Sequence, residues 1–223
     1  MLEYEIGEGV QAFTAGRGEA LPCEVTQAHQ VHGHEIARID RPGVTREELE
    51  GYDALITDVP GIAIGVRTAD CIPILLYDEV HRAIAAIHSG WKGTVKRISQ
   101  KVIFKMHQEY GTEAGELRAV IGPGICKDCF QVGEEVVSFF RDLDFPVEKI
   151  YSWTGARREG DMSTGHHIDL FEANRFLLCQ SGVPETRIHV CGLCTYEDEG
   201  FYSARREGIE CGRNITAICL KLR

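Results

Sequence analysis

Short apolar runs bounded by turn residues constrain the fold of this chain more than any other feature. Each run is too short for a buried helix and is rich in aliphatic residues, which is typical of strands. Glycines punctuate the segments between the runs, as expected of turns. The runs cover residues 62–66, 72–77, 83–87, 119–121, 188–190 and 215–220. The sequence therefore predicts strands distributed over most of the chain.

Helical periodicity appears between these strands. An apolar stripe from Val95 to Met106 predicts one helix, and a similar stripe predicts another over residues 134–143. Asp169 is placed to cap a third helix that ends before Gly182. Strands and helices mix without strict βαβ alternation, so we expect an α+β fold and not a doubly wound sheet.

Length and composition set the broad class. A chain of 223 residues that is 43% hydrophobic suits a single domain, which we expect to span residues 1–223. Candidate linkers are short, at residues 15–22, 41–45 and 155–165. No run reaches the roughly 18 apolar residues of a membrane span, and the acidic start differs from a secretory signal. We therefore expect a cytoplasmic protein that does not bind membranes.

The net charge of −10 disfavours non-specific binding to nucleic acid or anionic membranes. It leaves room for a small anionic substrate in a local basic pocket. The nine cysteines are an odd number, and in a cytoplasmic chain they should be reduced. Metal ligation, nucleophilic chemistry and plain burial remain as their roles.

Polar clusters interrupt the apolar runs at residues 30–34, 68–71, 88–94 and 201–206. Cys71 and His88 lie at the ends of two predicted strands, so they could meet if the strands are neighbours. Imidazole nitrogen and thiolate sulfur are ligands that Zn²⁺ prefers, and His32 would supply a third. Three protein ligands with one open coordination position are the arrangement of a catalytic zinc site. Spacing alone is weak evidence for such a site, because it also fits a buried cysteine with two hydrogen-bonded histidines.

Nucleophilic catalysis competes with metal binding at the same residues. Cys71 could act as a thiolate with His88 as its base, and Asp70 or His32 could orient the pair. Such a protein would be a cysteine hydrolase or amidase. The sequence does not separate the two readings, because both require a thiolate.

The remaining candidates are less specific. Two CxxC pairs, Cys126–Cys129 and Cys191–Cys194, have the shape of a structural zinc site, although more than 60 residues separate them and burial is the alternative. Arg205 and Arg206, with Lys92, could clamp a phosphate or carboxylate, or lie on the solvated surface. Trp91 could stack on a planar ligand or belong to the core, and we expect His166 and His167 in a loop.

Taken together, these clusters resemble the YfiH family, also described as multicopper polyphenol oxidases or laccases. The resemblance covers roughly residues 25–223, and its TADC and HSGWKGT motifs are highly specific. The matching motifs are QVHG at 30–33, DALIT at 53–57, GVRTADCIPILL at 65–76, HSGWKGT at 88–94, GPGI at 122–125, CFQVG at 129–133, HIDL at 167–170, CT at 194–195 and FYSARR at 201–206. The chain departs from the family pattern in a shortened N-terminal stretch, and Ala204 replaces the usual tyrosine of SYRR.

The resemblance implies an α/β/β/α sandwich with mixed sheets and a metal site made by His32, Cys71 and His88. Family members are described as purine nucleoside enzymes that carry out phosphorolysis of adenosine, inosine and methylthioadenosine and deaminate adenosine. Bacterial members are also linked to editing of peptidoglycan precursors.

The leading hypothesis is therefore a zinc-dependent purine nucleoside phosphorylase and deaminase. Its substrates would be a purine nucleoside and phosphate. The sequence also allows the protein to form a homo-oligomer. Cys71, His88, Asp70, Arg205 and Arg206 are its expected catalytic residues, with Asp70 as general base or as an orienting group. The alternatives are a laccase-like polyphenol oxidase with copper at the same ligands, the cysteine hydrolase or amidase, and a zinc-binding module without activity.

Overall fold

Two antiparallel strands, β7 (Ile72–Asp78) and β8 (Ala83–Ser89), form the centre of the fold. The computed structural model describes residues 1–154 and 165–222. Every residue of β7 and β8 is buried, which explains why both strands read as continuous apolar runs. They lie within a six-stranded sheet of order β13-β9-β7-β8-β5-β4. The other strands of this sheet are β13 (Ile188–Val190), β9 (Leu117–Ile121), β5 (Tyr52–Thr57) and β4 (Glu35–Arg38).

A second sheet of five strands, in the order β1-β2-β14-β6-β3, packs against the first. Its strands are β1 (Leu2–Glu3), β2 (Val10–Ala15), β14 (Asn214–Leu220), β6 (Ala63–Thr68) and β3 (Val25–Gln27). Leu55, Leu75 and Ile84 of the six-stranded sheet share one buried cluster with Ile64 and Ile218 of the five-stranded sheet. The space between the sheets is thus one apolar core.

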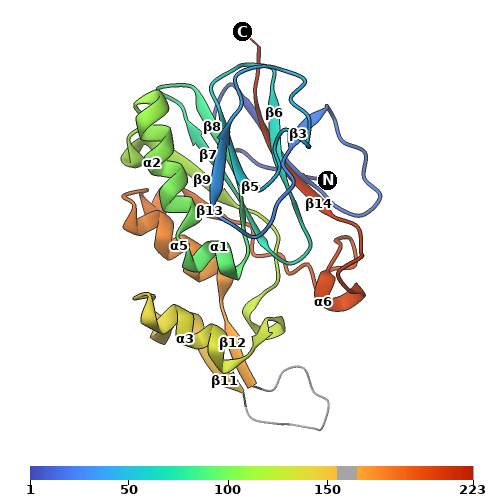
Figure 1. Cartoon of the computed structure of the whole chain (residues 1–223), viewed down its shortest axis with the longest axis vertical. Helices are drawn as coiled ribbons and strands as arrows, with labels where there is room; N and C mark the ends of the chain where they lie inside the picture. Colours follow the sequence, from blue (N-terminus) through green and yellow to red (C-terminus); the bar gives the residue numbers. More distant parts are fainter. Residues whose placement is uncertain (155–164, 223) are drawn as a thin grey trace.

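Helices cover the other face of the six-stranded sheet (Figure 1). They are α1 (Trp91–Val95), α2 (Ile98–Tyr110) and α5 (Leu170–Gln180). Val102 and Leu177 from these helices join Ile74 and Ile87 of the sheet in a second buried cluster. Parallel and antiparallel pairs occur in both large sheets. The predicted α+β class with mixed sheets is confirmed, in helix, sheet and sheet layers, with the short α6 (Ala204–Glu207) near the lower end of β14.

Local signals place the helix ends. The Asp169 carboxylate accepts a hydrogen bond from the Glu172 amide at 3.0 Å, and Gly182 has a φ of 100°, so the predicted cap and C′ residue are confirmed. The single helix predicted along the stripe from Val95 to Met106 is wrong. The chain forms two helices there, because Arg97 adopts a left-handed φ of 60° between them.

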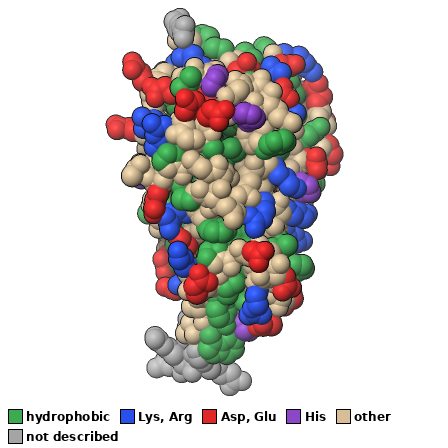
Figure 2. Space-filling model, turned by 90° about the vertical axis from the view of Figure 1, so that its left-hand side faces the viewer, with side chains coloured by type: hydrophobic (Ala, Val, Ile, Leu, Met, Phe, Trp, Pro, Cys, Tyr) green, Lys and Arg blue, Asp and Glu red, His purple; other side chains and the backbone are tan. Residues whose placement is uncertain are grey.

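A smaller region lies below the helices in Figure 1. It contains α3 (Glu134–Asp142), α4 (Val147–Ile150) and a three-stranded sheet of β10 (Gln131–Val132), β12 (Gly165–Ile168) and β11 (Tyr151–Thr154). His166 and His167 belong to β12, so the loop predicted for them is wrong. Figure 2 shows hydrophobic side chains gathered at this lower end, where Phe139 and Trp153 are exposed.

The structure agrees with one of the predicted linkers and differs from another. Ala15 ends β2, so the segment 15–22 begins inside a strand, whereas residues 41–45 are irregular as expected. The linker predicted at 155–165 lies outside the described residues, apart from Gly165. Short 3₁₀ turns occur at Ala114–Glu116, Lys127–Cys129 and Glu185–Arg187. None of the described helices has the length and hydropathy of a membrane span.

Candidate metal centre

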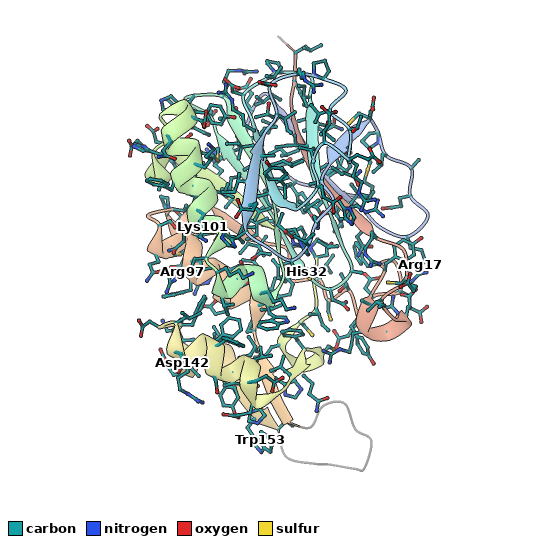
Figure 3. The ribbon with its side chains drawn as sticks, in the orientation of Figure 1. Arg17, His32, Arg97, Lys101, Asp142 and Trp153 are labelled. Atoms are coloured by element: carbon teal, nitrogen blue, oxygen red, sulfur yellow. The ribbon has the colours of Figure 1, made fainter. Side chains whose placement is uncertain are left out.

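His32, Cys71 and His88 come together at one end of the central strands. Their candidate ligand atoms all lie within 4.8 Å of one another. Cys71 directly precedes β7, and His88 lies near the end of β8, opposite Pro73. Antiparallel pairing therefore sets the thiol beside the imidazole, as expected if the two strands are neighbours. Figure 3 shows His32, the third member, between α1 and α6.

The third residue, His32, is held by an unusual loop. Its backbone is left-handed, with a φ of 59°. The buried Asp53 carboxylate of β5 accepts hydrogen bonds from the amides of Val31, His32 and Gly33, at 3.2, 3.0 and 2.6 Å. The rings of His32 and His88 lie edge to face with centroids 4.8 Å apart. Asp53 thus fixes the loop that brings His32 to the other two side chains.

The same carboxylate orients His88. Nδ1 of His88 lies 2.7 Å from Oδ1 of Asp53, and both side chains are buried. This contact leaves Nε2 of His88 as its ligand atom, in the carboxylate–histidine arrangement common at metal sites. In the sequence Asp53 is noted only as the first residue of the DALIT motif at 53–57. Its one distinguishing signal was a carboxylate at the start of an apolar run.

Electrostatics favour the charged forms of the pair. Burial opposes ionisation of Cys71, but the imidazoles of His88 and His32 outweigh it and lower the pKa of the thiol to about 6. Burial likewise favours neutral His88, but the Cys71 thiolate and the Asp53 carboxylate raise its pKa to about 9. The structure therefore presents a thiolate at neutral pH, which suits both a metal ligand and a nucleophile.

Gly90 leaves the space that this cluster needs. A Cβ at position 90 would lie 2.7 Å from Sγ of Cys71 and 3.4 Å from Cδ2 of His32. The glycine of the HSGW motif is therefore explained by a close approach to the thiol and not by its backbone, which has an extended φ of −69°.

Replacing Gly90 by alanine should displace Cys71 and weaken the affinity of this candidate site for added Zn²⁺ by roughly 10- to 100-fold, the range typical when the support of a ligand is lost. Competition with a chromophoric chelator would measure this affinity. Gly115→Ala is the matched control, because a Cβ there meets nothing within 4 Å. Equal affinities for the two variants would contradict the packing argument.

A cavity of about 470 Å³ opens beside the three residues. Its walls include His32, Cys71 and His88, together with Arg46, Arg67 and Arg213, and further His29, Gln30, Ala69, Ala204 and Ile209. Ala204, which replaces the tyrosine of the family motif, is thus a wall residue. The described residues offer no salt-bridge partner to any of the three arginines.

The three arginines form a basic cluster. Burial, then the positive charges of Arg46 and Arg213, lower the pKa of Arg67. Such mutual repulsion between guanidinium groups would be relieved by an anion in the cavity. None of the three was predicted as a site residue: Arg67 was noted only as part of the motif at 65–76, and Arg46 and Arg213 lie outside the matching motifs.

Arg205 and Arg206 do not line this cavity. The Arg205 guanidinium donates to the carbonyls of Cys129 and Gln131, and that of Arg206 to the carbonyls of Thr195, Tyr196 and Phe201. Their donors are therefore used to hold the main chain, which differs from the predicted phosphate clamp. Arg46, Arg67 and Arg213 line the cavity instead. The Arg213 guanidinium also donates to the carbonyls of Ile209 and Gly212, and that of Arg46 to the carbonyl of Ala28.

Asp70, Lys92 and Trp91 also take structural positions. The Asp70 carboxylate accepts hydrogen bonds from Oγ1 of Thr195 and from the Arg205 amide, both at 2.7 Å, so it anchors loops beside Cys71. This fits the orienting role predicted for it better than that of a general base. Lys92 is exposed, and Trp91 packs against Phe139.

Comparison with known proteins adds three findings. Residues 10–221 match the family described as multi-copper polyphenol oxidoreductase laccase. A purine nucleoside phosphorylase of Bacteroides thetaiotaomicron is 44% identical over 177 residues, covering 78% of this chain and 63% of that protein. Adenosine deaminase RL5, from an unknown prokaryotic organism, is 40% identical over 207 residues, covering 89% of this chain and 76% of that protein. The chain therefore spans less than two thirds of the length of the first relative.

Among solved structures, the hypothetical protein YfiH of Bacillus licheniformis superposes with a TM-score of 0.79 at 30% sequence identity. The superposition covers 88% of this chain and 74% of that protein. The fold described above is thus the fold of this relative.

Proposed function

The chain belongs to the multi-copper polyphenol oxidoreductase laccase family, and from that premise we propose that it is a zinc-dependent purine nucleoside enzyme. Its reactions would be phosphorolysis of adenosine, inosine and methylthioadenosine, and deamination of adenosine. Relatives named purine nucleoside phosphorylase and adenosine deaminase support a purine nucleoside as substrate. The observation that carries the proposal is the cavity that joins a metal-binding triad to three arginines without acidic partners.

The triad fits zinc by its chemistry. Two imidazole nitrogens and one thiolate are donors that zinc accepts, and ligand atoms within 4.8 Å of one another suit a tetrahedral site, whose ligand atoms lie about 3.5 Å apart. His32, Cys71 and His88 would hold the ion and leave one position open to the cavity. A zinc ion there would act as a Lewis acid toward an oxygen of substrate or water. Copper is the alternative metal, because the same donors also bind it.

The arginine cluster would hold phosphate in the cavity. A phosphate bound by Arg46, Arg67 and Arg213 would be positioned to attack C1′ of the ribose, while the bond from C1′ to the purine nitrogen breaks. Guanidinium groups bind phosphate through paired hydrogen bonds and remain charged throughout. In this scheme Asp70, Arg205 and Arg206 act as positioning residues, because they connect the loops on which the cavity is built.

The proposal is tested with zinc-loaded protein supplied separately with inosine and adenosine, with and without phosphate. Products are separated by chromatography. Release of hypoxanthine from inosine that requires phosphate would support phosphorolysis, and inosine formed from adenosine would support deamination. The absence of both products from protein that retains zinc would reject the proposed function.

Substitution of Arg67 by alanine should raise the KM for phosphate by roughly 10- to 150-fold, because a hydrogen bond to a charged group contributes about 1.5–3 kcal/mol. Initial rates at varied phosphate would measure the effect, with the KM for inosine as an internal comparison. Arg118→Ala provides a matched control on an exposed strand position, where it pairs with Glu79. An unchanged phosphate KM in the Arg67 variant would remove the arginine cluster from the scheme.

A cysteine hydrolase or amidase is the second candidate. The chain of contacts from Asp53 through His88 to Cys71 is also the arrangement of a Cys-His-Asp catalytic triad. The two functions differ in their inhibitors. Inactivation by iodoacetamide without any effect of EDTA would favour the hydrolase, whereas inactivation by EDTA that zinc reverses would favour the nucleoside enzyme.

A further inference from the structure

Three cysteines and a glutamate gather in a second cluster outside the candidate metal centre. Cys126, Cys129, Cys194 and Glu197 have candidate ligand atoms within 4.8 Å of one another. We refer to these four residues as the thiol cluster. Cys126 and Cys129 are separated by two residues, as are Cys194 and Glu197. This is the spacing of paired ligands in structural zinc sites, with a carboxylate in the place of one sulfur.

The backbone brings the two halves of the cluster together. The amide of Cys129 donates to the carbonyl of Cys126 at 3.2 Å, which closes the 3₁₀ turn between them. Gly124 forms a parallel bridge with Cys194, supported by a hydrogen bond from the Thr195 amide to the Gly124 carbonyl at 2.9 Å. Main-chain hydrogen bonds therefore hold the two loops side by side, whatever rotamers the four side chains adopt.

The hydrogen bonds and charges around the thiol cluster favour metal binding. All the cysteines are free thiols, and the Cys126 amide donates to Sγ of Cys194 at 3.3 Å. Amide hydrogen bonds of this kind stabilise negative charge on a ligating sulfur. Sγ of Cys129 lies 3.7 Å from Oε1 of Glu197. The Arg205 guanidinium, which contacts the Cys129 carbonyl, supplies positive charge next to an otherwise anionic set of ligands.

Cys191 does not belong to the cluster, which corrects the pairing of two CxxC motifs. Its thiol instead interacts with the hydroxyl of Tyr4. Glu197 replaces it, three residues beyond Cys194 in the Cys-x-x-Glu segment. In the sequence the two CxxC pairs indicated a possible site, with burial as the alternative, whereas a lone glutamate carries no ligand signal.

We propose that Cys126, Cys129, Cys194 and Glu197 bind a second zinc ion that is structural. Four protein ligands close the coordination shell and leave no position for substrate. The ion would join the loop at 124–130 to the loop at 191–198. Both loops contact Asp70: the Ile125 amide donates to its carbonyl at 2.9 Å, and Thr195 to its carboxylate. The second zinc would therefore brace the segment that carries Cys71.

Titration of metal-free, reduced protein with Co²⁺ tests the proposal, because each thiolate ligand adds to the sulfur-to-cobalt charge-transfer absorption. The wild type should bind two equivalents. The Cys71→Ala variant should bind one, with the strong absorption of three thiolates. The Cys126→Ser/Cys129→Ser variant should bind one equivalent, at the first centre, with the weak absorption of one thiolate. Cys191→Ser is the matched control and should bind two.

The result that overturns the proposal is a Cys71→Ala variant that binds no cobalt while it remains folded. A disulfide between Cys126 and Cys129 in protein purified and alkylated without reductant, with no metal bound, would overturn it equally. Should the double variant fail to fold, the Cys71→Ala titration decides alone. This inference does not rest on the nucleoside reaction, since every readout is metal content or absorption.

Discussion

Alanine in place of Cys71 is expected to abolish zinc retention at the candidate centre and to lower kcat/KM for inosine by about 10³-fold. The thiolate is the one anionic donor of the triad, and its pKa of about 6 keeps it ionised at neutral pH. A bound metal supplies several kcal/mol of transition-state stabilisation, and about 4 kcal/mol corresponds to that factor in rate. Metal analysis after gel filtration and steady-state assays of the same sample would measure both losses.

Two further variants make the Cys71 result specific. Cys179→Ala removes a partly exposed thiol on α5, away from the centre, and should leave both properties unchanged. Cys71→Asp replaces the thiolate by another anionic ligand and should keep part of the zinc and part of the activity. A Cys71→Ala variant that turns over inosine at the wild-type rate would refute the role of this residue.

Substitution of Asp53 by alanine should lower the free energy of unfolding by about 3–5 kcal/mol, as expected when one partner of a buried charged network is removed. The buried carboxylate accepts from three loop amides and from His88, and all four groups would lose their partner. Zinc affinity should fall as well, by roughly 10- to 100-fold, because His88 loses its orienting contact. Urea unfolding in the presence of a chelator separates the change in stability from the change in metal binding.

Asp58 provides the control for this experiment. It lies just after the same strand but its side chain is 40% exposed, and it pairs with Arg38 at 3.7 Å. Asp58→Ala should change stability by no more than about 0.5 kcal/mol. An Asp53 variant that is as stable as the Asp58 variant would show that the loop of His32 does not depend on this carboxylate.

The central strands and the candidate metal ligands were visible in the sequence for one physical reason. Strands covered on both faces must be apolar throughout, so the polar residues that interrupt them stand out. Cys71 and His88 were recognised in this way, and antiparallel pairing then brought them together. The cap at Asp169 was equally visible, because capping depends on residues that are close in the sequence.

The residues that were missed depend on contacts between distant segments. Arg46, Arg67 and Arg213 come from three separate parts of the chain and share a cavity only once the fold is formed. Glu197 is a ligand candidate only because Gly124 pairs with Cys194. The helix break at Arg97 was hidden for another reason, since a left-handed arginine has no sequence signature of its own.

The place of β14 in the five-stranded sheet bears on how the protein is made. β14 lies between β2 and β6, although its residues are synthesised long after those of both neighbours. Until then the nascent chain already holds His32, Cys71 and His88, yet β2 and β6 lack the neighbour that joins them. Unpaired strand edges of this kind invite aggregation and recruit chaperones. A stop before residue 214 would therefore yield a product destined for degradation, even though His32, Cys71 and His88 had all been synthesised.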